Sequence, residues 1–228
     1  MRSVSLSSLR TQARQRADAE SSDTSQAFVP DTELNGYINN SIAELYDLMI
    51  EANGDEYFAV SSSFATLSGD DTYPLPSDFY RLSGVDAAVG GFRYTLHLFP
   101  FGERNRFSNL TAPGWYRGAR LFYRLRNADI VFVPIPDAAY QITLWYIPNP
   151  PILVADGDSF DFQGGWEEYV IIDAAIKMQV KEESDTSVLQ LGKQQLIARI
   201  RGAAPKRDDG SPQLVTDVFS RDGEGWLW

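Results

Sequence analysis

The chain of 228 residues contains no cysteine and only one histidine. The lack of cysteine excludes disulfide bridges and thiolate catalysis, and it is typical of proteins made in a reducing cytosol. No window approaches the roughly 18 apolar residues that a membrane-spanning helix requires. The N-terminal segment also lacks the continuous apolar stretch of a signal peptide. We therefore expect neither a leader nor a membrane contact.

Motifs that support catalysis are also missing. The sequence has no nucleophile elbow, no phosphate-binding loop and no dinucleotide-binding glycine pattern. His97 lies in an apolar strand, where a packed or edge-exposed imidazole is more common than a general base. The adjacent pairs Glu167-Glu168 and Glu182-Glu183 point in different directions on a helix, so neither pair can flank one bond. We predict no catalytic residue, no cofactor and no enzymatic activity.

One segment partly resembles a calcium-binding loop. Asp156, Asp158 and Glu167 match positions 1, 3 and 12 of such a loop. However, Phe160 occupies the fifth position, and Asp161 stands where the sharp bend requires glycine. We therefore predict no metal site here and interpret the segment as a polar loop that leads into a helix.

Two amphipathic helices are expected near the start of the chain. Apolar residues recur at helical spacing near residues 5–20. A second and stronger pattern begins after Pro30, with Asp31 as the expected N-cap, and ends at Asn53-Gly54, a left-handed stop signal. The second helix is the best-marked element of the sequence.

The longest apolar pattern, residues 166–204, organises the rest of the chain. It carries a broad buried helical face in its first half and a second apolar stripe in its second half. The polar block 182–187 lies between them, and Ser184 or Asp185 could cap a new helix there. We expect two consecutive helices, with one kinked helix as the alternative.

Residues 57–163 have a different pattern of residue types. Short runs rich in β-branched and aromatic residues alternate with turn residues, which indicates antiparallel strands, and residues 126–129 suggest a hairpin turn. A short helix is expected near residues 103–107. We predict an α+β fold: a helical bundle (1–56 and 164–204), an inserted antiparallel β domain (57–163) and an extended tail (205–228).

Charge is segregated along the chain, whose net charge is −11. Residues 31–56 hold seven acidic residues and no basic one, whereas residues 81–126 hold eight arginines against two acidic residues. Such segregation suits complementary contacts between subunits, although solvated faces on a dipolar monomer explain it equally well. On the first interpretation Glu44, Asp47 and Glu51 would form an intersubunit or channel-facing acidic surface.

Arginines and aromatic residues alternate within one predicted strand region. The residues are Trp115, Tyr116, Arg117, Arg120, Phe122, Tyr123, Arg124 and Arg126. A stacking platform for single-stranded nucleic acid has this composition. Because the chain as a whole is acidic, we favour pairing of Arg117, Arg120, Arg124 and Arg126 with a neighbouring subunit's acidic surface.

Apolar residues also occur after the last helix. They are Leu214, Val215, Val218, Phe219, Trp226, Leu227 and Trp228. Tryptophans have little reason to remain in water. These residues therefore either fold back onto the chain or insert into a partner, and anchors of this type favour interfaces.

Four sequence segments, taken in order, resemble the head-to-tail connector (adaptor) proteins of tailed bacteriophages. They are DTELNGYINNSIAELYDLM, YPLPSDFYRLSGVD, VFVPIPDAAYQITLWYIP and GGWEEYVIIDAAIKMQVKEESDTSVL. The resemblance spans residues 5–217. It implies a virion protein, made in the host cytoplasm, that forms a homo-oligomeric ring, usually of twelve copies, below the portal protein. The ring would extend the channel through which DNA passes without specific binding.

Within this resemblance, the apolar residues 214–228 are assigned to the portal as a hypothesis. The β domain is assigned to the downstream tail component, which is a tail tube, nozzle or head-completion protein. The family brings no cofactor and no reaction. Two other functions stay open, namely a single-stranded nucleic-acid binding module and a carbohydrate-binding or cell-wall-active virion protein that uses exposed tryptophans and Glu168.

Overall fold

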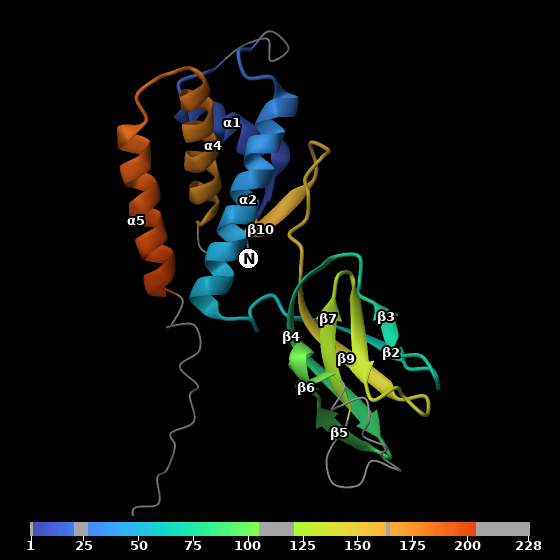
Figure 1. Ribbon diagram of the computed structural model, residues 1–228. Coiled ribbons are helices and arrows are strands. Elements are labelled where there is room, and N and C mark those ends of the chain that lie inside the picture. Colours follow the sequence, from blue (N-terminus) through green and yellow to red (C-terminus); the bar gives the residue numbers. More distant parts are fainter. Residues whose placement is uncertain (1, 21–26, 105–120, 163–164, 204–228) are drawn as a thin grey trace, which may run out of the picture.

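The structure is a computed structural model that describes residues 2–20, 27–104, 121–162 and 165–203. Helices gather at one end of the molecule and two β-sheets at the other (Figure 1). Buried apolar residues form two clusters, one among the helices and one between the sheets. These features confirm the predicted mixed α+β class. The proposed domain boundaries stay a prediction, and the predicted tail lies outside the described residues.

Four α-helices build the helical unit in the described part of the chain. They are α1 (Leu6–Arg16), α2 (Asp31–Asn53), α4 (Glu167–Lys181) and α5 (Ser187–Ala203). Helix α4 lies at the centre and contacts the other three, and nine of its residues are buried. Helix α5 is peripheral, with Ile200 as its fully buried residue.

Helices α4 and α5 are separate, so the kinked-helix alternative is wrong. The chain turns at Glu183, whose φ angle is +57°. The carboxylate of Asp185 then accepts a hydrogen bond from the Ser187 backbone N–H at 2.9 Å. This bond satisfies one of the free N–H groups at the start of α5.

Helix α2 ends as predicted but begins differently. Gly54, with φ +85°, stops the helix. At the other end Pro30 occupies the N-cap position, and Asp31 is the first helical residue. The prediction that Asp31 caps the helix is wrong, because its carboxylate forms ion pairs with Arg10 and Arg14 instead.

A two-stranded sheet that the sequence did not predict completes the helical core. Strand β1 (Arg2–Ser5) pairs antiparallel with β10 (Ser159–Phe162). Phe160 and Phe162 from β10 are buried among the helices, with their ring centroids 4.8 Å apart. The pair thus joins the start of the described chain and the segment before α4 to one core.

Two four-stranded sheets enclose the second core. The first sheet has the order β2 (Val60–Ala65), β9 (Gln141–Pro148), β4 (Phe79–Val89) and β5 (Phe92–Thr95). The second has the order β3 (Thr72–Pro74), β8 (Asp129–Val133), β7 (Phe122–Arg126) and β6 (His97–Leu98). The pairs are antiparallel as predicted, except that β6 and β7 run parallel.

Two local features of this region were predicted. The turn between β7 and β8 contains Asn127 at φ +57°, a conformation that asparagine tolerates better than most residues. A short helical turn, η1 (Phe101–Glu103), follows β6. It begins earlier than the predicted helix near 103–107, and residues 105–107 lie outside the described residues.

Candidate functional site

Helix α2 carries the three acidic residues that were predicted to form an intersubunit or channel-facing surface. Glu44, Asp47 and Glu51 are spaced by three and four residues, so they lie on one side of the helix. The Tyr80 hydroxyl donates to Asp47 at 2.6 Å, and Arg201 donates to the two Glu51 oxygens at 3.0 and 3.1 Å. These carboxylates have partners within the chain, and a role between subunits stays a prediction.

The third carboxylate, Glu44, belongs to an ionic cluster that joins α2, α4 and α5. At its centre Asp173 is buried and lies 2.6 Å from Lys177, from Lys193 and from the Ser41 hydroxyl. The same lysines contact Glu44 at 2.9 and 3.0 Å. Two positive charges therefore balance two negative ones, and the buried carboxylate of Asp173 has the paired cations that a buried charge requires.

The cluster shifts the pKa values of its members. Burial alone would raise the pKa of Asp173, but hydrogen bonds from Lys177, Lys193 and Ser41 lower it below its ordinary value of 3.8. Burial would likewise depress the pKa of Lys193, yet its bonds to Asp173 and Glu44 raise it. The charged forms are therefore favoured, and they hold α5 against α4.

Acid should weaken the fold through this cluster. Because the pKa of Asp173 is lower in the folded chain than its ordinary value of 3.8, its contribution to stability is complete above that value. The contribution is lost as the pH falls through the folded-state pKa. Urea unfolding at a series of pH values should show this loss in the wild type. An Asp173→Asn variant should lose less stability over the same range, and equal losses in both proteins would contradict the assignment.

The structure describes two residues of the predicted basic strand, Arg124 and Arg126. Arg124 donates to the Phe99 carbonyl oxygen at 3.2 Å, and its guanidinium lies 5.4 Å from the centre of the Phe101 ring. Arg126 is exposed at the end of β7, and His97 is exposed in β6. Arg124 thus contacts its own chain, and pairing of the basic strand with another subunit stays a prediction.

The other predicted site residues lie outside the described residues. They are Arg117, Arg120, Leu214, Val215, Val218, Phe219, Trp226, Leu227 and Trp228.

The carboxylates that resemble a calcium loop have separate partners. Asp158 accepts hydrogen bonds from two backbone N–H groups of its own loop, both at 2.8 Å. Asp156 binds Arg10, and Glu167 pairs with Arg2 at 2.7 Å. Across the described ranges no three histidine or acidic side chains gather closely enough to hold a metal ion. The loop therefore closes through hydrogen bonds and ion pairs.

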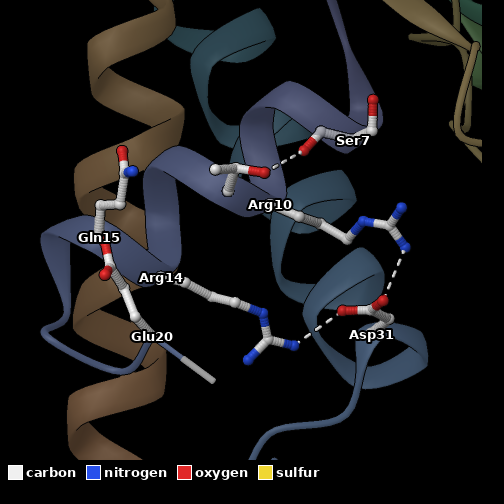
Figure 2. A pocket seen from close by; sticks show the side chains of 7 residues that line it. Ser7, Arg10, Arg14, Gln15, Glu20 and Asp31 are labelled. Carbon is white, nitrogen blue, oxygen red and sulfur yellow. Dashed lines mark hydrogen bonds and ion pairs between the residues drawn. The ribbon is translucent and has the colours of Figure 1, made fainter. Parts of the chain in front are cut away.

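A pocket of about 420 Å³ lies between α1 and the start of α2 (Figure 2). Arg10 and Arg14 point toward the carboxylate of Asp31 there, at 3.3 and 2.8 Å. Arg14 is buried and also donates to the Val29 carbonyl oxygen at 2.8 Å. Because Asp31 already supplies the negative charge, this arrangement fixes α1 against α2. Arg10 and Arg14 are four positions apart, which places them on one face of a helix. This spacing is the feature of the sequence that could have indicated a shared partner.

Hydrogen bonds connect α2 to the end of β9 and to the segment that follows it. The Tyr46 hydroxyl donates to the Pro148 carbonyl oxygen at 2.8 Å. The Asn39 side chain accepts from the Leu153 N–H at 2.8 Å and donates to the Leu153 carbonyl oxygen at 2.9 Å. Burial raises the pKa of Tyr46 to about 12. These bonds hold the segment after β9 beside α2.

A groove follows α2 along this junction, and we call it the junction groove. One part is lined by Ile50, Glu51, Gly54, Asp55 and Arg81, and the other by Asn39, Asn40, Ala43, Asn149, Pro150, Pro151 and Ile152. The hydrogen-bonded pair Asp47 and Tyr80 lines both parts, so the two parts are adjacent. The groove was not predicted, because it forms between segments that are distant in the sequence.

Comparison with protein families identifies a match over most of the chain. The family model described as SU10 adaptor protein matches residues 4–216. No curated protein matches the chain. None of the described helices combines the length and apolar character needed to cross a membrane. Because the match covers most of the chain, the protein belongs to the SU10 adaptor protein family and is a structural adaptor of a bacteriophage virion.

Proposed function

We propose that the protein is a head-to-tail adaptor, with a structural and not an enzymatic role. Twelve copies form a closed ring below the portal, extend the DNA channel and link the capsid to the tail. The partners are the portal protein on one side and a tail tube, nozzle or head-completion protein on the other. Membership of an adaptor family supports contacts with other proteins of the particle.

The observation that carries this proposal is the pair of separate cores joined by a hydrogen-bonded junction. The helical core and the sheet core each bury their own apolar residues. Bonds from Tyr46 of α2 to Pro148 of β9 and from Tyr80 of β4 to Asp47 of α2 connect the two units. One chain thus presents two connected units, as a protein that links two others requires. We assign the helical unit and residues 214–228 to the portal, and the sheets to the next tail component.

The net charge of −11 suits a channel wall. Proteins that hold DNA draw most of their affinity from positive charge near the phosphates. An acidic ring repels the phosphates instead, so that DNA passes without adhering.

Light scattering combined with negative-stain microscopy tests the proposal. The protein should be measured alone, mixed with its cognate portal, and beside the portal alone. We expect the mixture to gain the mass of a ring of adaptor chains, with new density at one end of each portal particle. A protein that leaves the mass and the shape of the portal unchanged would exclude the adaptor function proposed here.

A further inference from the structure

The junction groove presents apolar side chains to solvent at its far end. Ile152 is 76% exposed and Tyr80 is 44% exposed, and Pro150 and Pro151 lie between α2 and the sheets. The groove here encloses about 350 Å³, within the size range of sites that accept ring-sized groups. An exposed apolar site with a rigid wall is typical of a surface that binds an aromatic or aliphatic side chain.

Hydrogen bonds within the chain hold the walls of this site. Both ends of the Asn39 amide are used by Leu153. Asn149 donates from its backbone N–H to the Asp78 carbonyl oxygen and from its side chain to the Phe79 carbonyl oxygen. A preformed site of this kind loses little freedom when a side chain enters it.

Helix α5 ends beside the other end of the groove. Arg201, in its last turn, binds Glu51, which is itself a groove residue. From Gly54 to Asn40 the groove follows α2 for about 20 Å at the rise of an α-helix. The 23 residues from 204 to 226 can extend to about 70 Å. The segment that follows α5 can therefore reach every part of the groove.

The chemistry of that segment matches the groove. Lys206 and Arg207 follow the end of α5 by three and four positions, close to the near end of the groove, where Glu51 and Asp55 pair with Arg201 and Arg81. Trp226 and Trp228 supply the large apolar side chains that the far end can cover.

We propose that, in the free subunit, residues 204–228 bind the junction groove of their own chain, with the Trp226–Trp228 segment against Pro150, Pro151 and Ile152. The tether favours the chain's own groove, because it holds the segment at a high local concentration. This inference concerns the free subunit and does not depend on where the segment binds in the assembled particle.

Engineered disulfides test the proposal in the full chain, which has no native cysteine. Asn40→Cys, at an exposed groove position, is combined with Gly225→Cys. Ser61→Cys, at an exposed position on β2, is combined with the same tail cysteine as the matched control. Both proteins are oxidised at low concentration and analysed by non-reducing gel and peptide mass spectrometry.

We expect an intramolecular disulfide at Asn40→Cys that forms at least about tenfold faster than the control. Adding Trp226→Ser and Trp228→Ser should remove most of this advantage, because the aromatic anchors are lost. Equal rates in the two pairs would overturn the proposal, as would rates that do not respond to the serine substitutions. Disulfide-linked dimers as the main product would also overturn it, since they would place a second copy's tail in the groove.

Discussion

Deletion of residues 214–228 should abolish binding to the portal while the described fold persists. The deleted segment contains both tryptophans of the tail and its smaller apolar residues, and buried aromatic anchors at interfaces often contribute about 2 kcal/mol or more each. Loss of two such anchors alone corresponds to roughly a thousandfold weaker binding. Light scattering of mixtures with the portal measures the loss, and circular dichroism with thermal unfolding shows whether the fold persists.

A matched variant separates the apolar anchors from the rest of the tail. Arg221→Ala combined with Glu224→Ala leaves every apolar residue of the tail in place. This variant should bind the portal nearly as well as the wild type, because charged residues usually contribute less to the affinity of an interface than its aromatic anchors. Unchanged portal binding by the truncated protein would refute the assignment of this segment.

Replacement of Asp173 by asparagine should produce the largest loss of stability among single substitutions in the ionic cluster. Asp173 is buried, and it is the acceptor for Lys177, Lys193 and Ser41. Removing one partner from a buried ion pair leaves the other charge uncompensated and typically costs about 3 kcal/mol. The lysines are partly exposed, at 26% and 23%, so they recover some solvation and the cost stays near that value. Urea unfolding near neutral pH measures the difference in unfolding free energy.

Glu51→Gln is the matched control for this substitution. Glu51 also pairs with a cation of α5, but the side chains of Glu51 and Arg201 are 63% and 55% exposed. Solvent screens such a pair, so the control should lose less than about 1 kcal/mol. Similar losses for both variants would mean that burial of Asp173 does not strengthen its ion pairs.

The helices and most strands could be predicted because their signals are local. The spacing of Leu34, Ile38, Ile42, Leu45 and Met49 defines the buried face of α2, and all five are buried in the structure. Gly54 then ends the helix through its positive φ angle. Strand β9 alternates in the same way, with Ile142, Leu144 and Tyr146 in the sheet core. Each of these signals depends on residues within a few positions of one another.

Strand β1 could not be predicted in this way. Four residues carry too little alternation to distinguish a strand from a helix start, and the partner strand β10 lies more than 150 positions away. The charges presented a similar difficulty. The acidic residues of α2 suggested a surface for another subunit, but Glu44 and Glu51 find cations in α4 and α5 of the same chain.

The sequence by itself determined the class of elements, their order and the resemblance to phage adaptors, since periodicity, turn residues and motif order are properties of the linear chain. Only the tertiary structure decided which charges neutralise one another, how β1 closes the helical core and where the junction groove lies. Ser41 and Asp173, for example, are 132 positions apart yet share a hydrogen bond of 2.6 Å. Such contacts depend on how the two units pack, because packing brings distant side chains within reach of a short-range force.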